Sequence, residues 1–181
     1  MASVVFLRAV NVGGHQKFRP SALAKDLAQY GVVNIGAAGT FIVREPVKFA
    51  VLKEQIQRRL HFKPDMMICS GPELVALCDD GQFQDSIKIE EVKPFVTVLT
   101  KVPRKAPKFP IEQPAGDEWQ VRVIGIRGRF VLSLYRKLER MVAYPNNVVE
   151  KKFNLPATTR TWSTIATVYK ILEQDLMAEV S

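Results

Sequence analysis

The stretch that decides the fold is residues 4–17, which read VVFLRAVNVGGHQK. Its first four residues are apolar and two of them are β-branched, so they predict a buried strand. The glycines Gly13 and Gly14 follow, and paired glycines after a strand let backbone amides come close to a ligand. Three side-chain donors lie beside them, namely Arg8, Asn11 and Lys17. Together these groups favour the binding of an anion.

Helices and further strands alternate after this stretch as far as residue 80. A helix opens at Pro20, carries Leu23 and Leu27 on one face, and stops at Gly31. Strands are predicted over residues 40–44 and 65–69, and helices over 46–60 and 71–78. This alternation predicts a first α/β subdomain over residues 1–80, followed by a polar connection over 81–93.

Residues 94–181 predict a second subdomain that begins with strands and ends in helices. A β-rich run covers residues 95–100, and two further strands over 120–124 and 129–134 predict a hairpin whose loop is 125–128. A short helix is predicted over 147–153. From residue 161 to about 178, apolar residues recur at spacings of three and four, which is typical of a long amphipathic helix.

The start of this last helix is a second candidate for anion binding. Threonines favour helix starts, and the free amides and positive dipole end of a helix favour an anion there. Thr159 and Arg160 occupy this position. They are therefore candidate ligand-binding residues, although Arg160 would equally serve to bridge the two subdomains.

Composition and charge narrow the class of protein. Residues 1–92 carry 11 Lys and Arg against 10 Asp and Glu, whereas residues 93–181 carry 15 against 8, so the net charge of +8 belongs mainly to the second half. Such a basic half favours phosphorylated ligands, nucleic acid or acidic partners. No apolar run approaches a membrane span, so we expect a cytoplasmic protein with no membrane partner.

The cysteines and histidines predict neither a disulfide framework nor a metal site. The chain has two cysteines, Cys69 and Cys78, and two histidines, His15 and His61, without metal-ligand spacing. Both thiols are expected to be buried or half-buried. We therefore expect no metal and no cofactor.

Two separated motifs resemble those of the domain-of-unknown-function 1697 family. The first is Leu7 to Gly14, together with Lys17 and the helix that ends at Gly31. The second is an E-K-K run, Glu150 to Phe153, followed by Pro156 to Thr164, which is similar to that family's P-A-T-x-R-x-W-x-T ending. The resemblance implies an α+β protein with a ferredoxin-like N-terminal subdomain and a smaller α+β C-terminal subdomain.

Three functions are consistent with these residues. The first is binding of a small phosphate- or carboxylate-bearing ligand between the Gly13-Gly14 loop and the start of the last helix. The second is nucleic-acid binding by the basic half, which predicts that five cations share one face: Arg104, Lys105, Arg122, Arg127 and Arg129. The third is an enzyme that acts on an anionic substrate, with His15 or a carboxylate as the base.

Overall fold

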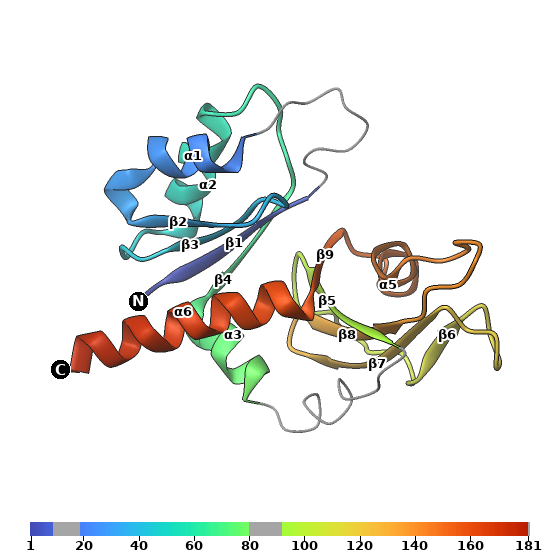
Figure 1. Cartoon of the computed structure of the whole chain (residues 1–181). Helices are drawn as coiled ribbons and strands as arrows, with labels where there is room; N and C mark the ends of the chain where they lie inside the picture. The colour runs from blue at the N-terminus through green and yellow to red at the C-terminus, as the bar shows by residue number, and fades with distance from the viewer. Residues whose placement is uncertain (9–18, 80–91, 181) are drawn as a thin grey trace. The chain divides into compact units, whose positions relative to one another are not determined.

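The computed structural model describes residues 1–8, 19–79 and 92–180, which form two compact units (Figure 1). Unit 1 comprises Met1–Val75 and Thr167–Ser181, and unit 2 comprises Ala76–Ala166. The sequence-based division placed all of residues 94–181 in the second subdomain. In the structure, residues 167–181 group instead with the first unit.

Unit 1 contains an antiparallel sheet in the order β2-β3-β1-β4. Its elements are, in chain order, β1 (Ser3–Leu7), α1 (Pro20–Asp26), the 3-10 helix η1 (Ala28–Tyr30), β2 (Val32–Ile35), β3 (Thr40–Val43), α2 (Phe49–Arg58) and β4 (Met66–Ser70). This β-α-β-β-α-β order is that of a ferredoxin-like motif. The α+β class is confirmed, and the ferredoxin-like description stays a prediction that the element order supports.

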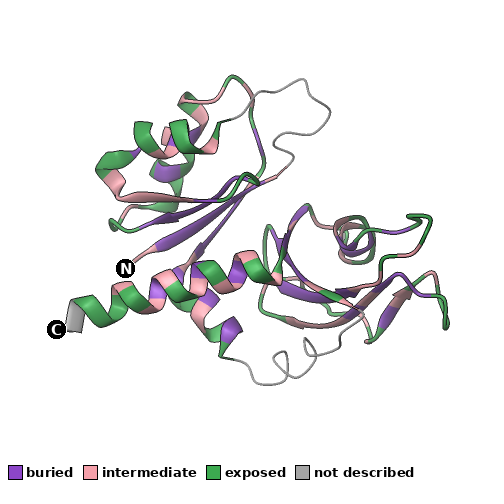
Figure 2. Cartoon of the chain, in the orientation of Figure 1, coloured by how far each residue is buried: buried purple, intermediate pink, exposed green. Residues whose placement is uncertain are grey.

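Apolar side chains explain why α1 and α2 pack on the sheet of unit 1. Leu23 and Leu27 lie four residues apart, so they face one side of their helical segment, and Leu52 and Ile56 do the same on α2. These side chains are buried in one cluster with Val5, Leu7, Phe41, Val43 and Ile68. As a result, β1 is buried along its whole length (Figure 2).

Unit 2 contains a second antiparallel sheet in the order β6-β7-β8-β5-β9. Its elements are β5 (Lys93–Leu99), β6 (Ile111–Gln113), β7 (Val121–Arg127), β8 (Phe130–Tyr135), α5 (Pro145–Phe153) and β9 (Ala157–Thr161). α5 packs on one face of the sheet, because Val148 and Val149 join the cluster that holds Val121, Val123 and Val131. This packing holds α5, the helix on which the candidate site lies, against the sheet.

Two helices contribute residues to both units, namely α3 (Gly71–Cys78) and α6 (Trp162–Val180). Within unit 1, Arg44 Nε and Nη2 donate to the two carboxylate oxygens of Asp175 at 2.8 and 3.0 Å. The far end of α6 is therefore bonded to the residue that follows β3. Cys69 on β4 and Cys78 on α3 are both buried, as predicted.

The predicted hairpin loop over residues 125–128 is wrong. Arg127 pairs with Phe130, so the turn consists of Gly128 and Arg129, and Gly128 adopts a left-handed conformation with φ 56°. The register shifts between Val123 and Gly125, where the strand continues through an irregularity. Gly125 is thus used inside β7, whereas Gly128 supplies the positive φ that a two-residue hairpin turn needs.

The predicted placement of Thr159 and Arg160 at the start of the last helix is also wrong, although the helix itself begins at Trp162, next to the predicted residue 161. Thr159 and Arg160 belong to β9, which pairs with β5. Threonine is β-branched and is at home in a strand, so the same residues that suggested capping serve the sheet instead. Thr161 does cap the helix, because its Oγ1 accepts a hydrogen bond from the Thr164 amide at 3.4 Å.

Candidate functional site

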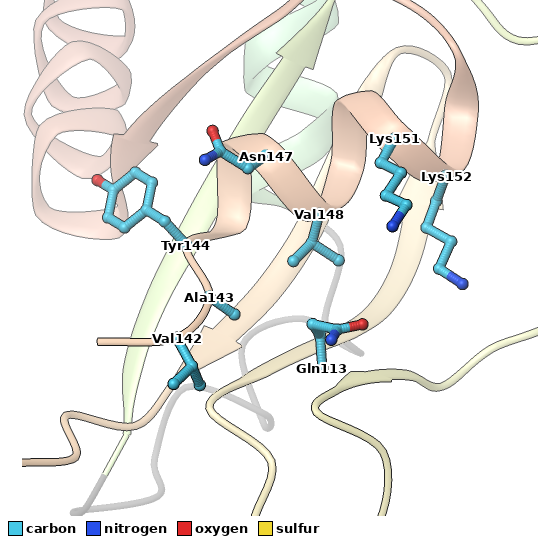
Figure 3. A pocket seen from close by; sticks show the side chains of 8 residues that line it. All are labelled: Gln113, Val142, Ala143, Tyr144, Asn147, Val148, Lys151 and Lys152. Atoms are coloured by element: carbon cyan, nitrogen blue, oxygen red, sulfur yellow. The ribbon is translucent and has the colours of Figure 1, made fainter. Parts of the chain in front are cut away.

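A hollow of about 220 Å³ lies beside α5 in unit 2, and we name it the α5 hollow. It is lined by Gln113, Val142, Ala143, Tyr144, Asn147, Val148, Lys151 and Lys152 (Figure 3). Three consecutive residues lead into α5, and Gln113 comes from the end of β6. The hollow is therefore built by one helix, the segment that precedes it and one strand end.

The position of the polar groups follows from the helical repeat of α5. Asn147 and Lys151 lie four residues apart and are exposed, whereas Val148 is buried and forms part of the apolar wall. Lys151 and Lys152 are in the last turn of α5, where cations interact favourably with the helix dipole. Both lysines are exposed.

The lysine end of the α5 hollow is positively charged. Figure 3 shows Lys151 and Lys152 extending from α5 toward the side on which the Gln113 amide lies. Within the described parts of the chain, neither lysine forms an ion pair. The neighbouring Glu150 is engaged elsewhere, because its Oε1 accepts a hydrogen bond from the Ala157 amide at 2.8 Å.

Tyr144 forms the opposite end of the α5 hollow. Its ring makes edge-on contacts with Phe95 and Tyr135, with ring centroids 5.9 and 6.1 Å apart, and 37% of the residue is exposed. Burial is the main cause that raises the pKa of the Tyr144 phenol above 10.0, and Tyr135 adds to it, while the positive charge of Arg160 opposes it. The phenol is therefore neutral near pH 7, and this end is aromatic.

Thr159, a predicted ligand-binding residue, instead holds α5 on the sheet. Its Oγ1 shares a hydrogen bond of 2.7 Å with Thr97 Oγ1 and donates to Asn146 Oδ1 at 3.1 Å. Asn146 lies in the first turn of α5, so these contacts join the start of the helix to two neighbouring strands. The side chain is engaged within the fold.

Arg160, the other predicted residue of this motif, is only 6% exposed. Its Nη1 donates to Thr158 Oγ1 at 2.8 Å and to the Thr159 carbonyl at 2.9 Å. Desolvation lowers the pKa of the Arg160 guanidinium to about 10, and the neighbouring Tyr144 partly offsets this change. Arg160 is still charged at pH 7, so it is a buried cation close to the Tyr144 end of the α5 hollow.

The predicted residues of the first loop are only partly described. Arg8 lies in unit 1, where its Nη1 donates to Asp65 Oδ2 at 3.0 Å. The other four predicted residues of this loop lie outside the described residues, namely Asn11, Gly13, Gly14 and Lys17. The same is true of His15. A ligand site that joins this loop to Arg160 therefore stays a prediction.

A second hollow, of about 580 Å³, lies at the C-terminal end of α5, and we name it the loop hollow. It is lined by Lys101, Pro103, Arg104, Lys105, Phe153, Asn154 and Leu155. Its three cations are exposed, and none of them forms an ion pair with another described residue. Asn154 ends α5 in the left-handed conformation with φ 51°, which turns the chain toward β9.

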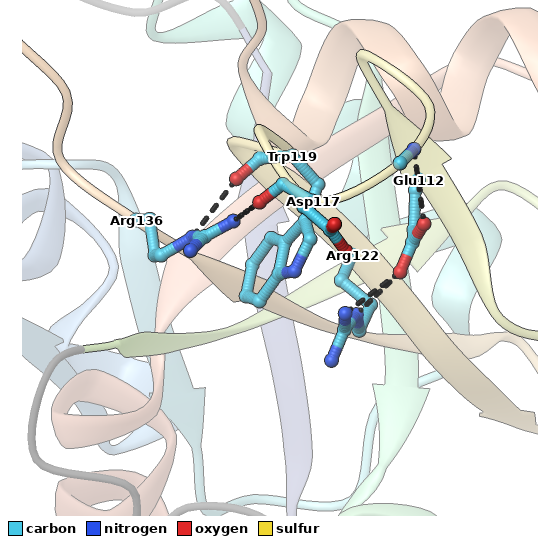
Figure 4. A network of polar contacts seen from close by, with 6 residues as sticks. Glu112, Asp117, Trp119, Arg122 and Arg136 are labelled. Carbon is cyan, nitrogen blue, oxygen red and sulfur yellow. Dashed lines mark hydrogen bonds and ion pairs between the residues drawn. The ribbon is translucent and has the colours of Figure 1, made fainter.

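Other cations of the basic half are used inside unit 2. The guanidinium carbons of Arg122 and Arg136 lie 4.2 and 4.1 Å from the centroid of the Trp119 ring, which they flank (Figure 4). Arg122 Nη2 also lies 2.7 Å from Glu112 Oε1. Arg136 donates to the carbonyl oxygens of Trp119 and Asp117. These two arginines hold a tryptophan in place.

The chain also resembles known proteins. Residues 1–126 match the family described as "Protein of unknown function (DUF1697)". The chain belongs to this family. A solved structure, "The structure of conserved bacterial protein SP0830 from Streptococcus pneumoniae", is similar with a TM-score of 0.57 and 14% identity. The similarity covers 94% of this chain and 98% of that chain, and at this identity it shows the fold alone. No curated protein matches the chain.

This DUF1697 chain shows neither a metal cluster nor a membrane span where its structure is described. Within residues 1–8, 19–79 and 92–180, no three His, Cys, Asp or Glu side chains gather as metal ligands would. Among the helices of the same ranges, none is long and apolar enough to cross a bilayer.

Sequence reasoning did not assign Lys151, Lys152 or Gln113 to a site. The sequence shows the two lysines only as part of the family-like E-K-K run. Gln113 lies in β6, a short strand that the sequence does not predict. The sequence signal that could have indicated a site at these lysines is the helical repeat of α5. This repeat directs Val148 and Val149 toward the core and therefore places Lys151 and Lys152 on the exposed side of the helix. The family match ends before α5, so it does not bear on these lysines.

Proposed function

We propose that this protein binds a small anionic ligand, bearing a phosphate or a carboxylate, in the α5 hollow. One observation carries the proposal: Lys151, Lys152 and the Gln113 amide line the same end of a hollow whose wall is apolar. Ligand sites commonly combine an apolar wall with a few polar groups that orient the ligand. Two ammonium groups and an amide suit an anionic group.

The electrostatics of the α5 hollow support an anion. The two lysine ammonium groups have no ion-pair partner among the described residues, so a ligand need not displace an internal carboxylate. The hollow is smaller than sites for drug-sized molecules, which are about 300–1,000 Å³. A short ligand with one charged end and an apolar or aromatic body fits these dimensions.

Binding of inorganic phosphate and of malonate, measured by isothermal titration calorimetry, tests the proposal. Replacing Lys151 and Lys152 by Met keeps the aliphatic stems and removes both charges, and it is expected to weaken binding by about tenfold or more. The matched control replaces Lys108 and Lys170, two exposed lysines outside the hollow, by Met. Equal affinity in the two double variants would contradict the proposal.

A further inference from the structure

The α5 hollow and the loop hollow are adjacent along the chain. The α5 hollow ends with Lys151 and Lys152, and the loop hollow begins with the next residue, Phe153. A helix rises about 1.5 Å per residue, so the change from one hollow to the other takes less than one turn of α5. The two hollows therefore both reach the C-terminal end of α5, where the lining of one ends at Lys152 and that of the other begins at Phe153.

A backbone hydrogen bond holds the basic loop beside the end of α5. The Thr100 amide donates to the Pro156 carbonyl at 3.1 Å, directly before the segment that carries Lys101. Pro103 lines the loop hollow between the cations and limits the conformations of its segment. The cations that follow Thr100 are thus held next to residues 153–155.

We infer that the α5 hollow also accepts one phosphate-bearing unit of a single-stranded nucleic acid, whose other phosphates lie along a basic track formed by Lys101, Arg104, Lys105, Lys151 and Lys152. This inference rests on the proposed anion binding in the α5 hollow and names the class of ligand. All five side chains are exposed, and within the described part of the chain none has an ion-pair partner. A run of such cations complements a chain of phosphates.

Aromatic side chains favour a single strand over a duplex. Tyr144 lines the α5 hollow and Phe153, which is half-buried against the core of unit 2, lines the loop hollow, so each recess combines cations with one partly exposed aromatic ring. Proteins that bind single strands without sequence preference combine a basic groove with aromatic rings on which bases stack. The bases of a duplex are already stacked on one another and offer no free face to these rings. The amide groups of Gln113 and Asn154 add neutral donors at the same surface.

Fluorescence anisotropy with a labelled oligouridylate of about ten nucleotides tests the inference. The variant that changes Lys101, Arg104 and Lys105 to Gln is expected to bind this strand about tenfold or more weakly. Its log–log salt slope is expected to be smaller by about 2, since each lost phosphate contact removes about 0.7. The control changes Lys25, Lys53 and Lys170 to Gln, which removes the same number of exposed charges from unit 1. Circular dichroism verifies that both variants are folded.

The outcomes separate this inference from the proposed function. Weaker binding in the loop-hollow variant than in the control, with phosphate binding unchanged, supports the inference. If phosphate binds through Lys151 and Lys152 but the oligouridylate binds no more tightly than phosphate, the inference fails and the proposed function stands. If neither probe binds, both fail. If polyglutamate of similar length binds as tightly as the oligouridylate, the inference is overturned in favour of an acidic protein partner. If a duplex binds more tightly than the oligouridylate, the preference for a single strand is overturned.

Discussion

In unit 2, Arg122 and Arg136 flank the Trp119 ring, whereas Lys151 and Lys152 extend from α5 into solvent. The arginines use planar groups that stack on an aromatic face and donate several hydrogen bonds, so they serve the fold. The lysines interact with the helix dipole but keep their ammonium groups hydrated. A basic half-chain therefore contains both structural and available cations, and only the available ones are candidates for ligand contact.

Replacing Trp119 by Ala is expected to have the largest effect on stability. The residue is 7% exposed, and its removal also leaves Arg122 and Arg136 without the ring that they contact. Large-to-small substitutions of this kind cost about 3–5 kcal/mol. The free energy of unfolding, measured by urea denaturation, checks this value. A loss below about 1 kcal/mol would show that this arginine-flanked ring is not structural.

Arg136 to Met is expected to lower the free energy of unfolding by about 1–3 kcal/mol. The change removes a cation–ring contact and leaves the carbonyl oxygens of Asp117 and Trp119 without these donors. Lys137 to Met is the control, because Lys137 is the exposed neighbour and loses the same charge. Equal unfolding midpoints for the two variants would remove the distinction between structural and available cations.

Tyr144 to Phe is expected to change the pH dependence of stability above about pH 10. The pKa of this phenol is raised by folding, so at alkaline pH the unfolded chain loses a proton that the folded chain keeps. Tyr144 therefore makes stability fall as pH rises through 10. Arg160 acts in the opposite sense, because its pKa is lowered to about 10 and folding becomes less costly once the guanidinium loses its proton.

Urea denaturation across an alkaline pH series measures this difference. The Tyr144 to Phe variant is expected to lose less stability than the natural sequence as the pH rises above 10. Parallel curves for the two proteins would mean that the aromatic end of the α5 hollow does not hold its proton in the folded chain.

The smallest effect is expected for the Lys151 and Lys152 to Met double variant, whose unfolding free energy should change by about 0.5 kcal/mol or less. Both side chains are exposed, and each makes no ion pair with the described residues. Replacing these two lysines should therefore weaken ligand binding while it leaves the free energy of unfolding almost unchanged. A large loss of stability, measured in the same urea experiment, would place these lysines with the structural cations.

Several features of the fold could be predicted because strong local signals mark them. Gly31 ends the first helical segment with φ 60°, and the repeat of Leu52 and Ile56 marks the buried face of α2. The short strands β2, β6 and β9 were missed, since three to five residues carry little periodicity and depend on partners distant in sequence. The family and the α+β class were predicted correctly.

The candidate site was less predictable than the fold. Whether a cation is available depends on what folds against it, and no local pattern reveals that Arg122 meets Trp119 and Glu112. The same holds for Arg160, which is buried in β9 and pairs with Val96 of the distant strand β5. The lysines of α5 were visible in the helical repeat, but the hollow beside them required Gln113 from another strand.

The assignment of α6 to both units has a consequence for synthesis on the ribosome. All of unit 2 is made before Asp175, the carboxylate that Arg44 of unit 1 binds, because that residue lies near the end of the chain. Domains generally fold as units during synthesis. The second unit is therefore able to complete its core before the first unit has acquired the part of α6 that belongs to it, although most of the first unit leaves the exit tunnel earlier.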